Sequence, residues 1–288
     1  MRASAAQVAA GLVLLRATVL FPAPFAAMRE RFCEGGDKAF IRSLWSSQQW
    51  DTGGGGRRGT FHKTTDGRYV LKQVNRSEFD TFQKHGREYF AYLSQTHTTL
   101  PSLLVKVMGA FAVEFIDRST KRRQEQFLLV QENLFHGHNV SRVFDLKGAN
   151  RDSSPIGEDD SETVLDENFF HFNSGHPLLL SEVDKQQLTR ALHNDTLFLQ
   201  TINVIDYSLL VGVVQQPQDA SAAGASQQER RTLVVGVIDY CRQFHLLEKL
   251  EFHVRHRTVM PPRQYRGRFR DAMHRYFVAS MESQRGGK

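Results

Sequence analysis

The sequence predicts an α+β fold of two lobes, with an antiparallel sheet in the first lobe and mixed helices and strands in the second. Segments with helical and strand periodicity follow in the order helix, hairpin, helix, strands, helix, strands, helix. The length of 288 residues suits one large domain or two lobes that share a cleft. The sequence contains no internal repeat that would indicate a solenoid or a propeller.

The first expected lobe, over residues 16–135, begins with a strand around residues 18–21 and a helix over residues 25–50. Residues 1–15 contain an apolar patch that resembles a weak signal peptide, but Arg16 interrupts the apolar stretch. We therefore expect an N-terminal extension there and not a leader. No run of 18 apolar residues is present, so no helix is expected to cross a membrane.

A Gly-rich segment leads into a predicted β-hairpin that carries a lysine. Two short strands flank Asp66-Gly67, and an Asp-Gly turn between two such strands is typical of a hairpin. With a two-residue turn, Lys72 pairs with Phe61, which follows Gly59 closely. The hairpin therefore brings Lys72 to the place where the Gly-rich segment enters the sheet. Taken alone, a run of glycines is more often a flexible linker.

The remaining elements complete both lobes. A helix is expected over residues 77–93, where apolar residues follow helical spacing, and a buried strand over residues 127–131. The second lobe, residues 136–288, is expected to contain strands at 142–147, 207–214 and 232–239, helices at 181–200 and 264–281, and polar loops at 151–162 and 215–230. The last of these helices is basic and amphipathic.

The composition predicts a soluble intracellular protein with a basic C-terminal part. Cys33 and Cys241 are the two cysteines, too few for a disulfide scaffold or a multi-cysteine zinc module. The net charge is +6, and residues 242–275 carry nine basic against three acidic residues, so this stretch accounts for the whole excess. Such a field attracts phosphate on a nucleic acid, an anionic membrane or a small substrate, although a solvated helix face has the same composition.

Asp145 and Lys147 are predicted to share one face of a strand, because alternate side chains of a strand point to the same side. Phe144 and Leu146 then point to the other side, into the core. Gly148 follows and permits a close approach of the backbone to a ligand. An acid and a base on one face are also compatible with a simple ion pair.

Asp206 and Asp239 each lie in an Ile-Asp-Tyr tripeptide, at the start of strand 207–214 and at the end of strand 232–239. If these strands pair antiparallel, both carboxylates arrive at the same end of the ladder. Two carboxylates there repel each other unless a cation lies between them, and Mg²⁺ takes a few carboxylate oxygens with phosphate and water. A single Asp of this kind would merely cap a strand, but the repeated tripeptide favours a metal site.

A Gly-rich turn, a strand lysine, paired carboxylates and a basic neighbourhood together indicate phosphoryl transfer. That chemistry needs backbone donors and a lysine on the phosphates, carboxylates on Mg²⁺ and an oriented hydroxyl. The His-Arg-Asp, Asp-Phe-Gly and Ala-Pro-Glu motifs of protein kinases are absent from the sequence. The parts therefore match a kinase whose motifs differ from those of protein kinases.

At these residues the sequence resembles the phosphatidylinositol phosphate kinases, and most of all the class that phosphorylates phosphatidylinositol 3-phosphate on the 5-hydroxyl. The resemblance covers nearly the whole chain from about residue 16. It is carried by Tyr69–Gln73, Gln131–Leu134, Val143–Gly148, Leu165–Asn168, His193–Thr196, Ile205–Gly212 and Val235–Tyr240. It implies the two-lobed fold of that family, distantly related to protein kinases, with ATP and Mg²⁺ as cofactors.

The resemblance also implies a role for each matching residue. Lys72 would bind the α- and β-phosphates of ATP, Asp239 would bind Mg²⁺, and Asp206 would bind the metal or orient the lipid hydroxyl. Asp145 and Lys147 would face the transfer site, where Lys147 offsets charge on the moving phosphoryl group. Contacts to ATP are also expected from Gly55, Gly56 and Gly59, and contacts to the lipid from Arg151, Arg255 and Arg257.

Three further expectations follow from the resemblance. An acid on the helix that begins near residue 77 would pair with Lys72, and Glu78 and Asp80 are both candidates. Residues 253–263 are fewer than the family's lipid-selecting activation loop contains, so membrane contact would fall to the basic C-terminal stretch. The expected location is cytoplasmic and peripheral, on endosomal or vacuolar membranes, with a phosphoinositide in an anionic membrane surface as partner.

Three functions are compatible with these observations. The first is an active lipid kinase that converts phosphatidylinositol 3-phosphate to the 3,5-bisphosphate. The second is a non-catalytic phosphoinositide-binding or scaffold protein, which the complete set of core residues disfavours and the short loop slightly favours. The third is a soluble inositol polyphosphate kinase, which the Asp-Tyr-Ser-Leu-Leu stretch disfavours. Nucleic acid is not an expected partner, because no aromatic platform accompanies the basic stretch.

Overall fold

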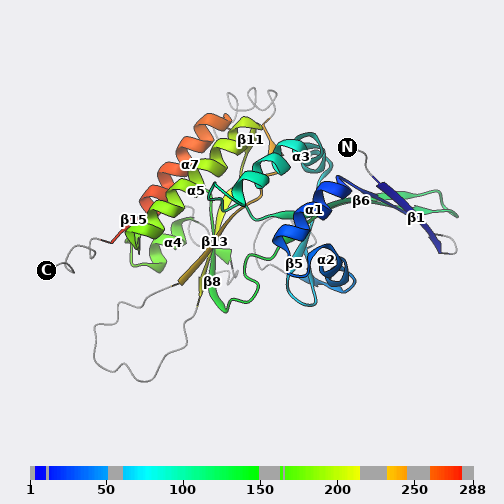
Figure 1. Cartoon of the computed structure of the whole chain (residues 1–288), viewed down its shortest axis with the longest axis horizontal. Helices are drawn as coiled ribbons and strands as arrows, with labels where there is room; N and C mark the ends of the chain where they lie inside the picture. The colour runs from blue at the N-terminus through cyan, green and yellow to red at the C-terminus, as the bar shows by residue number, and fades with distance from the viewer. Residues whose placement is uncertain are drawn as a thin grey trace, which may run out of the picture.

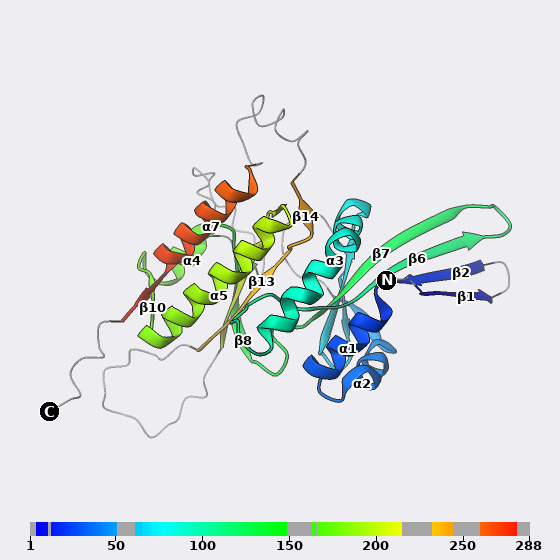
Figure 2. The same ribbon diagram turned by 45° about the horizontal axis from the view of Figure 1, so that its top comes forward.

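Seven strands form one antiparallel sheet in the computed structural model, which describes residues 4–10, 13–50, 61–148, 163–164, 166–214, 232–244 and 260–280. The strand order is β1-β2-β6-β7-β5-β4-β3. The strands are β1 (Ser4–Ala10), β2 (Val13–Val19), β3 (Ser47–Trp50), β4 (Phe61–Thr64), β5 (Tyr69–Val74), β6 (Val107–Asp117) and β7 (Arg123–Glu132). Figures 1 and 2 show β1, β2, β6 and β7 extending together beyond the helices.

Three helices accompany this sheet: α1 (Pro22–Phe32), α2 (Gly36–Leu44) and α3 (Arg76–Thr96). Stacked and edge-on aromatic rings join α1 to α3, with Phe25 between Phe82 and Phe90 at centroid distances of 5.9 and 5.0 Å. A glycine is required in α3 where Phe21 crosses it, because a Cβ on Gly86 would lie 2.3 Å from the Phe21 ring. The packing of α1 against α3 therefore depends on aromatic contacts.

A four-stranded sheet with the order β13-β12-β8-β9 forms the second half of the fold. Its strands are β8 (Val140–Leu146), β9 (Thr163–Val164), β12 (Ser208–Val214) and β13 (Thr232–Ile238). The helices described in this half are α4 (Asp166–Phe172), α5 (Glu182–Thr201) and α7 (Pro262–Tyr276). Two short sheets pair β10 (Leu178–Leu180) with β15 (Phe277–Ala279) and β11 (Val204–Ile205) with β14 (Arg242–Gln243). Figure 1 shows α5 and α7 side by side.

The two halves are joined by backbone pairing and by one buried carboxylate. The amide of Val105 donates to the carbonyl of Val237 in β13 at 3.0 Å. Asp195 of α5 is fully buried and accepts hydrogen bonds from the Tyr92 hydroxyl of α3, from Ser102 and from the Leu103 amide. Burial raises the pKa of Asp195 to about 6, although these donors stabilise its charge. The carboxylate thus ties α5 to α3 and to the segment that pairs with β13.

The structure confirms the hairpin register and most of the expected helices and strands. Phe61 pairs with Lys72, as the two-residue turn requires. The helices expected over 77–93 and 181–200 are α3 and α5. The helix expected over 264–281 is α7, but it ends at Tyr276, and Phe277–Ala279 form strand β15 instead. No described helix is long and apolar enough to span a membrane. The loops expected at 151–162 and 215–230 lie outside the described residues.

The single helix expected over residues 25–50 is wrong. Two helices and a strand replace it, because Gly35 and Gly36 adopt φ values of 78° and 63°, which end one helix before the next begins. Residues 47–50 form β3, which pairs with β4. The strand expected around residues 18–21 is the end of β2, which begins at Val13 and pairs with the long strand β6.

Candidate active site

Strand β8 presents two polar side chains on one face, as predicted. Phe144 and Leu146 are 1% and 0% exposed, whereas Asp145 and Lys147 on the alternate positions are half-buried. Gly148 was expected to let the backbone approach a ligand closely, but its described neighbours belong to helix α7. A Cβ at Gly148, where φ is 67°, would lie 2.8 Å from the Cβ of Ala272, so this glycine admits helix α7.

Asp206 and Asp239 lie at the same end of the β12–β13 ladder, as predicted. The strands pair antiparallel with Ser208 opposite Ile238, so each aspartate lies next to the last paired residues. Both residues have left-handed backbone conformations, with φ of 65° and 63°. Such conformations are uncommon outside glycine, and Asp and Asn tolerate them best. Two strained turns that each present a carboxylate at one sheet end are characteristic of a functional site.

The protein's own cations neutralise these carboxylates. Lys72 of β5 forms an ion pair with Asp239, which joins the first sheet to the end of β13. Lys147 Nζ lies 3.0 Å from Asp206 Oδ1, and Arg242 Nη1 lies 2.9 Å from Asp206 Oδ2. Burial disfavours the charge of Lys72, but the Asp239 carboxylate more than offsets this and holds the lysine pKa above its usual value.

Asp145 is the carboxylate without such a counterpart. Its Oδ1 atom is buried and has no hydrogen-bond partner among the described residues. Burial raises the pKa of Asp145, and the negative charges of Asp239 and Asp206 add to this, whereas Ser208 and Lys147 act in the opposite direction. The Ser208 hydroxyl is close enough to affect the carboxyl, yet it makes no hydrogen bond of regular geometry. A buried polar atom without a partner costs free energy, and a bound ligand would relieve that cost.

The prediction that an acid of helix α3 forms an ion pair with Lys72 is wrong. The Glu78 side chain instead accepts from the backbone amide of Asn75 at 3.0 Å and completes a capping box at the start of α3. Asp80 pairs with Arg76 one helical turn away. Neither acid forms an ion pair with Lys72, whose partner is Asp239. The Asn-x-x-Glu spacing is the sequence signal that identifies Glu78 as a cap.

Two residues that sequence analysis did not assign also position the site. In the sequence, Arg242 was counted only as part of the basic excess of the C-terminal part. In the structure, β14 pairs with β11, so that Arg242 lies opposite Ile205 and reaches Asp206. Asp166, at the start of α4, accepts a hydrogen bond from the Lys147 amide at 2.9 Å. Asp166 lies within the segment Leu165–Asn168, and Arg242 follows shortly after Asp239, so both were within reach of motif reasoning.

The remaining predicted site residues are not among those that the structure describes. These are Gly55, Gly56 and Gly59 of the Gly-rich segment and the three arginines Arg151, Arg255 and Arg257. Within the described ranges, no group of three or more His, Cys, Asp or Glu side chains forms a ready metal cage. Mg²⁺ does not require one, because it is commonly bound by one or two carboxylates together with phosphate and water.

Comparison with known proteins decides the family. Residues 48–231 match the family described as phosphatidylinositol-4-phosphate 5-kinase. The chain belongs to the phosphatidylinositol phosphate kinase family. It is 34% identical over 284 residues to the 1-phosphatidylinositol 3-phosphate 5-kinase of Saccharomyces cerevisiae. The aligned region covers 93% of this chain and 12% of the yeast protein. Its α+β architecture is the fold of that family.

Relatives from an animal and a plant show the same level of similarity. The human 1-phosphatidylinositol 3-phosphate 5-kinase is 35% identical over 269 residues, which cover 88% of this chain and 12% of the human protein. The 1-phosphatidylinositol-3-phosphate 5-kinase FAB1A of Arabidopsis thaliana is 35% identical over 281 residues, 93% of this chain and 15% of the plant protein. The chain therefore spans less than a fifth of the length of each of these relatives.

Proposed function

We propose that this chain is the catalytic part of a lipid kinase that transfers the γ-phosphoryl group of ATP to phosphatidylinositol 3-phosphate and forms the 3,5-bisphosphate. The observation that carries the proposal is the convergence of Lys72 with Asp239, and of Lys147 with Asp206, where the two sheets meet. The relatives named as 1-phosphatidylinositol 3-phosphate 5-kinases support the choice of substrate. ATP use follows from membership of a kinase family.

The described residues suit Mg²⁺ and ATP phosphates. Three carboxylates, Asp145, Asp206 and Asp239, face one region, and Asp145 brings a buried oxygen without a partner. Mg²⁺ held by these carboxylates would supply positive charge that offsets the negative charge developing in transfer. Asp239 and Asp206 would hold the metal, and Lys72 would bind the α- and β-phosphates. The Lys72–Asp239 ion pair must open for this, since each group now neutralises the other.

The other groups at the site would orient the reacting hydroxyl and stabilise charge. Lys147, held by Asp206, would offset negative charge on the moving phosphoryl group. Asp145 would accept a hydrogen bond from the lipid hydroxyl, and its raised pKa makes it a better proton acceptor than an ordinary carboxylate. Gly55, Gly56 and Gly59 would cover the ATP phosphates, and Arg151, Arg255 and Arg257 would grip the inositol phosphate.

The proposed setting is the cytoplasmic surface of endosomal or vacuolar membranes. The basic residues of the C-terminal stretch would supply attraction to an anionic leaflet, at roughly 1 kcal/mol per exposed Lys or Arg near the surface. Three of them, Arg263, Arg270 and Arg275, lie on helix α7 without an ion pair among the described residues. This peripheral attachment needs no membrane-spanning helix.

Transfer of radiolabelled phosphate tests the proposal. The purified chain would be incubated with labelled ATP, Mg²⁺ and vesicles that each contain one phosphatidylinositol monophosphate, with Asp239→Ala as the inactive control. Label on the 3-phosphate lipid, absent in the control, is the expected result. Label on another monophosphate would change the substrate and keep the chemistry. Vesicle binding without transfer to any lipid would contradict the proposal and favour a non-catalytic phosphoinositide-binding role.

Replacement of Arg242 tests how Asp206 is positioned. Arg242→Gln removes the 2.9 Å contact to Asp206 Oδ2 and leaves Lys147 as the cation on that carboxylate among the described residues. A hydrogen bond between charged groups contributes about 1.5–3 kcal/mol, so kcat for lipid phosphorylation is expected to fall about 10- to 100-fold. KM for ATP should change little. Arg242→Lys should retain more activity than Arg242→Gln.

The matched control for this prediction is Arg87→Gln, which removes an equal charge from an exposed position of α3. Steady-state kinetics with both substrates would be measured for each variant. Equal kcat values in Arg242→Gln and the unmodified chain would show that Lys147 alone positions Asp206.

A further inference from the structure

Helices α5 and α7 place basic side chains opposite one another along their shared seam. Lys185, Thr189 and His193 follow every fourth position of α5, and Arg266, Arg270 and His274 follow every fourth position of α7. Side chains four residues apart lie on one face of a helix. The helices run antiparallel, so Lys185 lies by His274 and His193 lies by Arg266. We call Lys185, Thr189, His193, Arg266, Arg270 and His274 the basic seam.

No carboxylate neutralises the basic seam among the described residues. Lys185 Nζ instead donates to His274 Nδ1 at 3.4 Å, and an Arg266 amino group lies 3.5 Å from His193 Nδ1. Arg270 is half-buried and makes no hydrogen bond or ion pair within that part of the chain. The positive charges of Lys185, Arg266 and Arg270 are therefore not neutralised by any described carboxylate, and such a cluster attracts an anion.

Arg268, two residues before Arg270 on α7, has partners that Arg270 lacks among the described residues. Arg268 donates to the carbonyl of Lys147 at 3.3 Å and stacks on the ring of Tyr265 at 4.7 Å, so it supports the active-site strand. Residues two apart on a helix point about 200° away from each other. Arg270 therefore points away from the face of α7 that packs on Lys147 and Gly148. The basic seam is separate from the proposed transfer site.

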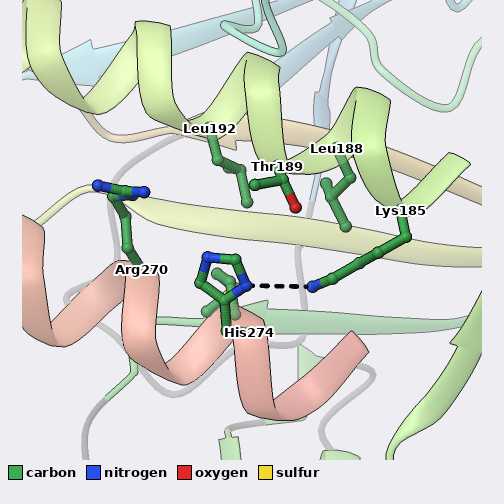
Figure 3. Close-up of a pocket in the computed structure, with 7 residues that line it drawn as sticks. Lys185, Leu188, Thr189, Leu192, Arg270 and His274 are labelled. Carbon is green, nitrogen blue, oxygen red and sulfur yellow. Dashed lines mark hydrogen bonds between the residues drawn. The ribbon is translucent and has the colours of Figure 1, made fainter. Parts of the chain in front are cut away.

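A hollow at one end of the basic seam has the donors that a phosphate group requires. Its floor is apolar, formed by Leu188, Leu192 and Met273, which are 8%, 4% and 2% exposed. Figure 3 shows Lys185 and Arg270 at its two ends, with the Thr189 hydroxyl and the His274 ring between them. The ammonium, guanidinium, hydroxyl and imidazole that border this shallow hollow are all groups that can donate a hydrogen bond to a phosphate oxygen at its mouth.

We propose that the basic seam is a second phosphate-binding site, which takes a phosphomonoester group of an inositol phosphate. The proposal stands apart from the proposed kinase function, because no residue of the basic seam takes part in transfer. The phosphomonoester can come from a free inositol phosphate or from a phosphoinositide in a membrane. The experiment separates these two sources.

The test compares two double variants with equal charge. Lys185→Gln/Arg270→Gln removes both ends of the hollow, and Arg87→Gln/Arg190→Gln removes two exposed charges, from α3 and α5, that lie outside the hollow and outside the basic C-terminal stretch. The probes are inorganic phosphate, inositol 1,3-bisphosphate, and phosphatidylcholine vesicles with or without phosphatidylinositol 3-phosphate. Calorimetry and vesicle sedimentation at low salt measure binding, since salt screens such contacts. We expect at least about tenfold weaker binding in the first variant only.

The His274 imidazole gives a local readout of the site. Burial, Lys185 and Arg270 lower the pKa of His274, and Asp271 on its own helix opposes them. A bound phosphate would stabilise the imidazolium and raise that pKa, so affinity should increase as pH falls through the pKa of the bound state. NMR titration of the ring with and without inositol 1,3-bisphosphate measures the shift, and His274→Gln assigns the signal.

Each outcome decides the proposal. A rise in the His274 pKa with a soluble probe supports a site for free phosphates, and loss of vesicle binding in the first variant alone supports a lipid-borne phosphate. Equal loss in both double variants, or an unchanged His274 pKa with every probe, would overturn the site. If Lys185→Gln/Arg270→Gln does not fold by circular dichroism, the exposed single substitution His274→Gln takes its place. A failed transfer assay would leave these measurements intact.

Discussion

Replacement of Asp239 by asparagine is expected to lower phosphoryl transfer at least about 10³-fold, which corresponds to about 4 kcal/mol of activation free energy. An amide has no net charge and cannot balance Mg²⁺ as a carboxylate does. Asparagine tolerates the left-handed conformation that Asp239 adopts at φ 63°, so the turn should survive. Kinetics at increasing Mg²⁺ concentrations would measure the loss, which higher Mg²⁺ should restore only in part.

The same substitution has a structural effect through Lys72. It leaves a largely buried ammonium without the carboxylate that now neutralises it, so the free energy of unfolding should fall by about 1–3 kcal/mol. Addition of Lys72→Met removes the unpaired charge, and the double variant should be more stable than Asp239→Asn alone. Urea unfolding of the single and double variants forms a cycle that isolates the coupling. Activity should not return, because the proposed phosphate-binding lysine is then absent.

Asp80→Asn is the matched control for Asp239→Asn. It makes the same chemical change at an exposed carboxylate that pairs with Arg76 on the surface of α3. Transfer and stability should stay near those of the unmodified chain, since exposed ion pairs contribute about 0–1 kcal/mol. Retention of more than a tenth of the activity by Asp239→Asn would refute the metal-binding role of Asp239.

Local geometry made part of the site predictable from sequence. The Asp66-Gly67 turn fixes the partner of every residue in its hairpin, which is why Lys72 was expected opposite Phe61 and is found there. Antiparallel pairing likewise fixes Asp206 and Asp239 at one end of their ladder. In both cases a short connection or an alternating pattern determines where side chains point.

Contacts between distant segments were not predictable in this way. Lys72 and Asp239 are 167 residues apart, and their pairing depends on how segment 103–105 docks on β13. We expected an acid of the following helix as the partner of Lys72, although the Asn75-x-x-Glu78 pattern assigns Glu78 to a cap. The prediction of one long helix over residues 25–50 was wrong, because two adjacent glycines with positive φ permit a break between two helices that the apolar periodicity does not reveal.

Asp206→Asn is expected to reduce kcat at least about 10³-fold while KM for ATP changes little, because Asp206 is proposed to hold the metal and to position Lys147 at the transfer site. The substitution removes the carboxylate that Lys147 and Arg242 share, so both cations lose this ion pair at the transfer site. The positive charge that is no longer offset by Asp206 would bind phosphate more strongly in the ground state. Initial-rate kinetics with varied ATP and varied lipid would separate this effect from a loss of nucleotide binding.

A comparison with Asp206→Ala distinguishes the loss of charge from the loss of backbone conformation. Asp206 has φ of 65°, which alanine adopts only with strain and asparagine adopts more readily. Both variants should lose transfer, but only alanine should also lower the free energy of unfolding through backbone strain, by about 1–2 kcal/mol. If asparagine destabilises the chain as much as alanine does, the ion pairs with Lys147 and Arg242 hold the turn. If asparagine retains transfer, then Asp145 and Asp239 together would have to supply the carboxylates that the reaction needs.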